Sequence, residues 1–134
     1  MATGTTEYTE ALRGHFHAPR NAGEFPAGTE QVIEGRAGSR RQGREISLAL
    51  RLRGERVAEC RYRVYGCPAT IALCSILSER LKGRALAELS GFRALELAEE
   101  FGLPPAKRAA ALLLEDALKA ALARYNKTSR LETV

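Results

Sequence analysis

Three cysteines are the residues of this chain best suited to metal or sulfur chemistry. They are Cys60, Cys67 and Cys74, spaced seven residues apart. A thiolate is a nucleophile and a good ligand for zinc and iron. An odd number of cysteines, in a chain whose N-terminus lacks the basic and apolar layout of a signal peptide, favours reduced thiols over a disulfide framework. All three thiols are therefore expected to be free.

The three cysteines differ in their predicted settings. Cys67 comes just before Pro68, a residue suited to the first position of a helix, so its thiolate would be favoured by the helix N-terminus and by nearby arginines. Alternatively, Cys67 is a buried, inert residue whose size fits the turn. Cys60 lies on the apolar side of a predicted strand. Cys74 lies about 10 Å along the helix from Cys67, whereas thiolates sharing one metal approach within about 4 Å. We therefore expect Cys60 and Cys74 to pack in the core.

Alternating apolar residues before Cys67 predict an antiparallel hairpin. Its strands cover residues 45–53 and 56–65, joined by a tight turn at Gly54 and Glu55. One strand carries Ile46, Leu48, Leu50 and Leu52 at alternate positions; the other carries Ala58, Cys60, Tyr62 and Val64, with Val57 on the opposite face. A hairpin with one apolar face must be covered by other elements.

Helical patterns follow the hairpin and supply that cover. Apolar residues recur at helical spacing over residues 68–82 and 104–125, a shorter helix is expected between Ser90 and Gly102, and residues 7–16 are compatible with helix. The stretch 36–44 is interpreted as a flexible basic loop. Its arginines, Arg36, Arg40, Arg41 and Arg44, form either an anion-binding patch or a solvated run. The order of elements predicts an α+β fold with helices on one face of an antiparallel sheet.

Composition limits the remaining possibilities. The 134 residues suit a single domain over 1–134, with a core of about 7–126 and a frayed tail at 127–134. No apolar run approaches the length that crosses a bilayer, so we expect a cytoplasmic protein without membrane insertion. The net charge of +5 is compatible with an acidic protein partner or nucleic acid. A balance this modest makes nucleic acid the less favoured partner.

Five segments, in order along the chain, resemble motifs of the IscU/NifU family of iron–sulfur cluster scaffolds. They are Tyr8-Thr9-Glu10 with His15 to Gly23, then Tyr62 to Cys67, Leu81 to Arg84, Leu103 to Lys107, and Leu114 to Leu122. The resemblance implies a three-stranded antiparallel sheet packed on one face by helices. It also implies a site in which three cysteines, an aspartate and a histidine hold zinc or a nascent [2Fe–2S] cluster.

Four of the five implied ligand positions carry other residues in this sequence. The Cys-Gly-Asp motif reads Gln42-Gly43-Arg44, the His-Cys pair reads Ala109-Ala110, and Cys67 alone is kept. One thiolate cannot hold a cluster that needs four ligands, and Arg44 places a fixed positive charge where a carboxylate would bind cations. We therefore expect no cofactor and no catalytic residue, with Cys67 as the one retained metal position.

The resemblance also implies protein partners. Leu103, Pro104, Pro105, Ala106 and Lys107 match the segment that an Hsp70-type chaperone recognises in the family, although a proline-initiated helix explains the prolines equally well. We expect a non-enzymatic adaptor or accessory subunit that docks on a cysteine desulfurase, a scaffold homologue or a larger enzyme complex. The alternatives are an assembly factor that uses Cys67 for a shared cluster or for sulfur, and a basic nucleic-acid-binding module.

Overall fold

A computed structural model describes residues 9–133, with side chains described for residues 9–125. Residues 7 and 8 of the expected core, including Tyr8 of the first motif, lie outside the described residues. The elements in order are α1 (Glu10–His17), β1 (Val32–Ser39), β2 (Arg44–Arg53), β3 (Arg56–Tyr65), α2 (Pro68–Leu81), α3 (Leu86–Leu89), α4 (Ala94–Glu100) and α5 (Arg108–Thr133). Short 3-10 turns occupy Arg40–Gln42 and Pro105–Lys107. No helix in the described part is long and apolar enough to cross a membrane.

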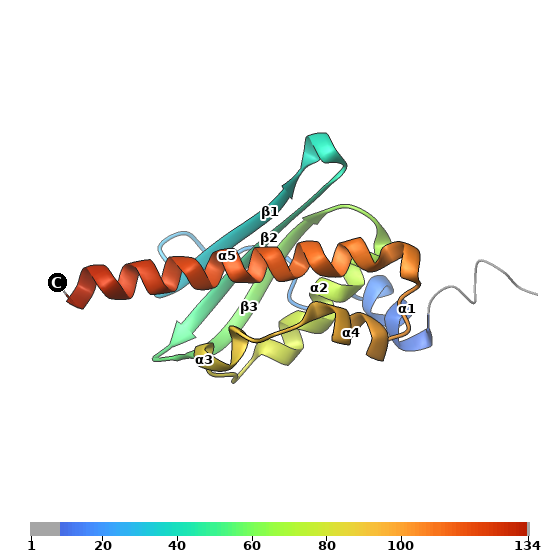
Figure 1. Cartoon of the computed structure of the whole chain (residues 1–134). Coiled ribbons are helices and arrows are strands. Elements are labelled where there is room, and N and C mark those ends of the chain that lie inside the picture. The colour runs from blue at the N-terminus through green and yellow to red at the C-terminus, as the bar shows by residue number, and fades with distance from the viewer. Residues whose placement is uncertain (1–8, 134) are drawn as a thin grey trace, which may run out of the picture.

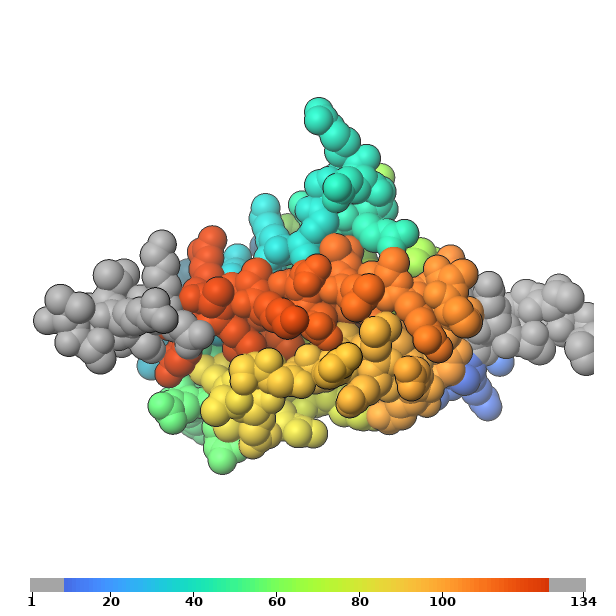
Figure 2. All heavy atoms as spheres, viewed as in Figure 1, coloured from blue at the N-terminus to red at the C-terminus, as the bar shows by residue number. Residues whose placement is uncertain are grey.

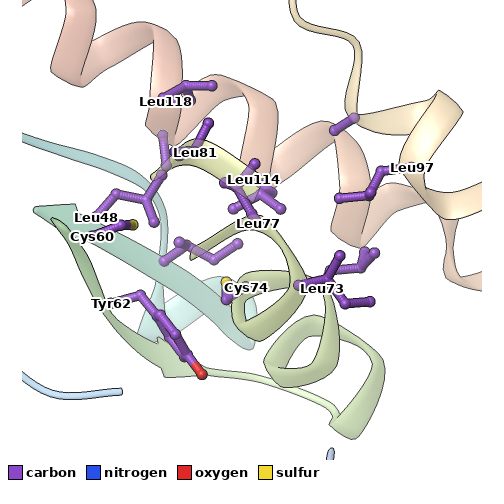
Figure 3. Packing of buried hydrophobic residues seen from close by; sticks show 14 of the residues in the cluster. Leu48, Cys60, Tyr62, Leu73, Cys74, Leu77, Leu81, Leu97, Leu114 and Leu118 are labelled. Atoms are coloured by element: carbon purple, nitrogen blue, oxygen red, sulfur yellow. The ribbon is translucent and has the colours of Figure 1, made fainter. Parts of the chain in front are cut away.

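The strands form one antiparallel sheet in the order β1-β2-β3, and α2 and α5 pack on the same face of it (Figure 1). The predicted α+β fold is confirmed. The alternating residues Ile46, Leu48 and Leu50 are fully buried between this sheet and the helices, as expected. Figure 3 shows Leu48 of the sheet packing with Leu77 of α2 and Leu114 of α5, so the core lies between two layers.

The resemblance implied a third strand without placing it, and the interpretation of residues 36–44 as a flexible loop is wrong, because β1, a 3-10 turn and the start of β2 occupy most of this stretch. Residues Val32–Ser39 pair with β2 along their whole length, and the turn at Arg40–Gln42 ends at Gly43, which has a left-handed backbone. The two glycines of this stretch, Gly38 and Gly43, both have a positive φ, while Gly35, just before the stretch, has a different role. A Cβ at Gly35 would lie 2.2 Å from the carbonyl oxygen of Ala117, so glycine allows α5 to pack directly on β1. In Figure 2 the tip of this hairpin projects above the rest of the molecule.

An irregularity in the pairing of β2 with β3 corrects a second expectation. The register shifts between Arg51 and Leu52, which places Val57 opposite Leu52. Val57 is consequently buried, although strict alternation with Cys60 assigned it to the outer face. A bulge of this kind leaves no clear signal in an alternating pattern.

The C-terminal helix begins and ends later than predicted. A 3-10 turn at Pro105–Lys107 precedes it, because Pro104 holds an extended backbone, and α5 starts at Arg108. It then continues through Thr133, past residue 127, where a frayed tail was expected to begin. Neither glycine nor proline interrupts this stretch. The short helix α3 between α2 and α4 was also not expected.

A polar cluster around His15 holds α1 against α2. The imidazole Nδ1 lies 2.8 Å from the hydroxyl oxygen of Ser75, and the Arg20 guanidinium lies 3.2 Å from Nε2. The carboxylate of Glu79 is 3.7 Å from Nε2. Burial and the positive charge of Arg20 lower the pKa of His15, a second nearby cation, Arg80, acts in the same direction, and Glu79 opposes them. Protonation of His15 is therefore less favourable in the folded state than in the unfolded chain.

The sheet face can be tested with two aspartate substitutions on one strand. Leu48→Asp would bury an unpaired charge and should unfold the domain, which circular dichroism would show as loss of the thermal transition. Ala49→Asp is the matched control, because Ala49 is half-buried on the other face, opposite Arg61. It should melt close to the parent. Equal stability of the two variants would contradict the assigned face.

The His15 cluster predicts a pH dependence of stability. The folded-state pKa lies below the unfolded value of about 6.5, so the unfolded chain binds this proton more tightly. The stabilisation is complete above that value and is lost as the pH falls below it toward the folded pKa. Urea unfolding between about pH 7 and pH 5 should therefore show a steeper loss for the parent than for His15→Gln. If the free energy of unfolding of His15→Gln changed with pH as steeply as that of the parent, this role of His15 would be refuted. The same holds if the exposed control His17→Gln reduced the pH dependence as much as His15→Gln.

Candidate functional site

Cys67 lies at the junction of the sheet and the first long helix. β3 ends at Tyr65, Gly66 follows, and Cys67 is the N-cap residue of α2, with Pro68 in the first turn. The side chain is half-buried, and its sulfur lies 3.3 Å from the hydroxyl oxygen of Thr70. The prediction that Cys67 starts a helix is confirmed, and the thiol remains accessible.

The surroundings of Cys67 make its thiol easier to ionise than an ordinary cysteine thiol. Partial burial opposes ionisation, but hydrogen bonding from Thr70 and from the backbone amides of Thr70 and Ala69 outweighs it. The positive charge of Lys107 acts in the same direction, and the result is a pKa of Cys67 below the usual value. Of the two interpretations left open by the sequence, the reactive cysteine has the better support from this environment.

Three of the four substituted positions line one open hollow beside α5. Gln42 and Arg44 come from the β1–β2 hairpin, and Ala109 comes from the first turn of α5. Leu112, Leu113 and Asp116 complete the lining. The fold therefore brings together residues that are far apart in sequence, as the resemblance implied.

The remaining two of the five implied ligand positions, Cys67 and Ala110, lie next to residues that line this hollow. A Cβ placed on Gly66 would lie 3.7 Å from that of Arg44, which sets the segment leading to Cys67 beside the hairpin. Ala110 neighbours Ala109 on α5, but its side chain is buried. Among the described residues, no group of three or more histidine, cysteine, aspartate or glutamate side chains is placed to hold a metal ion. Of the residues that the structure describes, the possible metal donors that line the hollow are the amide of Gln42 and the carboxylate of Asp116, and the thiol of Cys67 lies outside that lining.

Cys60 and Cys74 lie in the core, as predicted. Both are fully buried, and Figure 3 shows them between the sheet and α2 among leucine side chains. Burial raises the pKa of Cys60 to about 12 and that of Cys74 well above its usual value. These two thiols are unsuited to nucleophilic chemistry in the folded protein.

The arginines proposed as one anion patch are divided between two surfaces. Arg36 and Arg40 line a trough on the outer face of the sheet, whereas Arg44 lines the hollow with Gln42. Arg41 is exposed at the hairpin tip. The division follows from strand alternation, since residues 36 and 44 stand on opposite faces of the hairpin.

The predicted partner segment is only partly available. Leu103 is buried in the core and Pro104 is half-buried, while Pro105 and Ala106 are exposed. Lys107 is half-buried and close enough to Cys67 to lower its pKa. A partner would therefore meet a short turn instead of an extended peptide.

Sequence reasoning missed two residues that shape the site. Thr70 contacts Cys67 from three positions along α2, a spacing that could have indicated it once the helix start was placed. Asp116 joins the hollow from the third turn of α5, and the sequence alone shows it as an ordinary carboxylate on the outer face of the helix.

Comparison with known proteins gives consistent similarities over the chain. A family described as NifU-like N terminal domain matches residues 7–131. The iron-sulfur cluster assembly scaffold protein IscU of Escherichia coli (strain K12) is 37% identical over 119 residues, which cover 88% of this chain and 93% of that protein. The mitochondrial iron sulfur cluster assembly protein 1 of Yarrowia lipolytica is 32% identical, over 94% of this chain and 70% of that protein.

A similar fold occurs in solved structures. A nitrogen-fixing NifU-like protein (N-terminal) from Brucella abortus has a TM-score of 0.69 at 18% identity and covers 90% of this chain and 95% of its own. A putative iron-sulfur cluster assembly scaffold protein for the SUF system from Fervidobacterium islandicum has a TM-score of 0.66 at 16% identity, over 90% and 99%. At these identities the likeness concerns the fold alone.

These similarities overturn one expectation. The sequence analysis predicted that no cofactor belongs to this chain, because four ligand positions are substituted. That prediction is wrong: the chain matches the NifU-like N terminal domain, and its relatives are iron-sulfur cluster assembly scaffold proteins.

Cys67 should be the one cysteine of the native protein that reacts quickly. Its rate of alkylation by iodoacetamide, followed by mass spectrometry against pH, should have a midpoint below that of an ordinary thiol. Lys107→Ala and Thr70→Val should each raise the midpoint, because each removes a group that favours the thiolate. Arg108→Ala, a neighbouring exposed cation, is the control. Equal rates for all three cysteines would show that Cys67 is not activated.

Proposed function

Because this chain belongs to the family of NifU-like N-terminal domains, we propose that it acts in iron–sulfur cluster assembly as an adaptor that contacts the cluster through Cys67. The cluster is cargo, and a partner protein supplies the other ligands. The chain itself performs no catalytic step. The observation that carries this proposal is Cys67, a half-buried thiol with a lowered pKa, whose neighbour Gly66 packs against Arg44 in the lining of the hollow formed with Gln42 and Ala109.

The donor set supports sharing of the cargo. A [2Fe–2S] cluster takes four ligands, usually thiolates, and the described part of one chain offers a single accessible thiolate at this site. Arg44 adds a fixed positive charge that would repel metal cations but attract the carboxylates or thiolates of a partner. The geometry therefore favours a ligand set completed from outside the chain.

Two kinds of partner suit this arrangement. A scaffold homologue, or a second copy of this chain, would bring further thiolates to the cluster. A cysteine desulfurase would use Cys67 differently: its terminal persulfide sulfur would bond to the Cys67 thiolate while the bond to the enzyme's cysteine sulfur breaks, leaving a thiolate on the enzyme. An Hsp70-type chaperone would contact the exposed Pro105 and Ala106.

The proposal predicts iron uptake that depends on Cys67. The protein is incubated anaerobically with ferrous iron, sulfide and dithiothreitol, whose thiols stand in for those of a partner. Iron and acid-labile sulfide should be bound by the parent and by Cys74→Ser, and lost in Cys67→Ser. Cys74→Ser is the matched control, because its thiol is buried away from the site. Iron retained by Cys67→Ser, or no uptake by the parent, would refute the proposal.

The substituted positions predict a second result. Gln42→Cys, Arg44→Asp, Ala109→His and Ala110→Cys together should complete a site with Cys67 and bind zinc far more tightly than the parent. Outer-shell changes alone alter metal affinity by about 10–100-fold, so added ligands should exceed this. Competition with a chromophoric chelator measures the affinity, and the double variant at positions 109 and 110 should be intermediate. A folded fourfold variant with parental affinity would show that the positions do not converge.

A further inference from the structure

The outer face of the sheet carries a trough that the proposed function does not use. The helices that pack on the sheet, α2 and α5, lie on the opposite face, and the central strand presents the small side chains of Ser47 and Ala49 outward, where they form the floor of the trough. The segment 23–29, between α1 and β1, forms one bank. The cavity volume is about 400 Å³, large enough for several residues of a peptide.

Two rows of side chains cross this trough. The pairing of the strands sets Arg36, Ser47 and Arg63 side by side in one row, and Glu34, Ala49 and Arg61 in the next. Neighbouring strands lie about 4.8 Å apart, so the two arginines of the first row are rooted about 10 Å from each other across a serine. Guanidinium groups so placed can hold one carboxylate between them, with the serine hydroxyl below.

Most charged side chains along the sides of the trough already have an ion-pair partner. Arg63 pairs with Glu24, and Arg61 pairs with Glu59 at 2.9 Å while lying 5.2 Å from the centre of the Phe25 ring. These contacts orient Arg61 and Arg63, the arginines of β3 that line the trough, before any ligand binds.

Near the hairpin tip, the side chain of Arg40 is likewise held by its neighbours. Arg40 lies 5.3 Å from the centre of the Tyr65 ring and 3.9 Å from the carboxylate of Glu45. Within residues 9–125, Arg36 and Glu34 are the charged residues of the lining that have no ion-pair partner. The unmatched charges of the trough are thus one positive and one negative, two residues apart on β1.

This pattern favours a polypeptide over a polyanion. The carboxylates of Glu24, Glu34 and Glu45 line the same trough and would repel the successive phosphates of a nucleic acid. In an extended peptide, side chains at positions i and i+2 point the same way and lie about 7 Å apart. The two rows of the trough have the same separation, because they too are two residues apart along a strand.

We propose that this trough binds an extended segment of a protein partner that carries an acidic and a basic side chain two residues apart. The acidic side chain lies over Ser47 between Arg36 and Arg63. The basic side chain lies beside Glu34, over Ala49. Binding at this face does not involve Cys67, which lies beyond the end of β3.

The test uses a blocked peptide, acetyl-Gly-Ser-Glu-Ser-Lys-Ser-Gly-amide, titrated at millimolar concentration into the full chain labelled with ¹⁵N. The amide resonances of Ser47 and Ala49 should shift in a saturable way. A peptide of the same composition with Glu and Lys adjacent, acetyl-Gly-Ser-Ser-Glu-Lys-Ser-Gly-amide, should bind more weakly, because its two charges then point to opposite sides.

Variants locate the interaction. Arg36→Glu should weaken binding by at least about tenfold, since it removes a charge-assisted hydrogen bond and adds repulsion. Arg53→Glu is the matched control, an exposed arginine on β2 that is outside the lining, and should change binding by less than about twofold. Cys67→Ser should leave binding unchanged, which separates this site from the proposed function.

Three outcomes would overturn the proposal. Shifts that are absent, or that fall on the hairpin tip instead of Ser47 and Ala49, would show that the trough does not bind the peptide. If Arg36→Glu and Arg53→Glu weakened peptide binding equally, the effect would come from the net charge of the protein and not from the trough. Tighter binding of a ten-nucleotide oligothymidylate at the same resonances would identify a nucleic-acid surface instead.

Discussion

The close approach of α5 to β1 at Gly35 is the contact on which the rest of this structure depends. A side chain there would meet the backbone itself, 2.2 Å from the carbonyl oxygen of Ala117 and 2.3 Å from the amide nitrogen of Ala121. Backbone cannot rotate away as a side chain can, so a larger residue would lift the helix from the sheet. With α5 in place, the leucines of β2 are enclosed between two layers, and β1 has a partner on its inner face.

The same contact sets the geometry of the candidate site. Since α5 is fixed against β1, its first turn brings Ala109 to the hairpin residues Gln42 and Arg44. The turn at Cys67 approaches from the other side, because β3 and α2 meet there. The site is therefore assembled at the meeting point of a hairpin, a strand end and two helix starts.

Sequence patterns predicted those elements whose side chains alone decide their structure. The alternation of Ile46, Leu48 and Leu50 predicted β2, and Pro68 predicted the start of α2, as the structure confirms. The patterns did not place β1, where Gly35 is explained only by its contact with a helix more than eighty residues later in the chain. The matched family confirms the predicted resemblance, while the expectation of no cofactor is overturned by the relatives, which are iron-sulfur cluster assembly scaffold proteins. Local sequence patterns therefore do not predict contacts between distant segments or with partner proteins.

The central claim is that one chain contributes a single thiolate to a cluster that other molecules complete. Native mass spectrometry of the iron-loaded protein tests this most directly, because it counts the chains and small thiols attached to each cluster. The account predicts cluster mass only on species that contain a second protein chain or bound thiol molecules, with Cys67 present. A cluster retained by one chain, with no other protein or thiol attached, would contradict it.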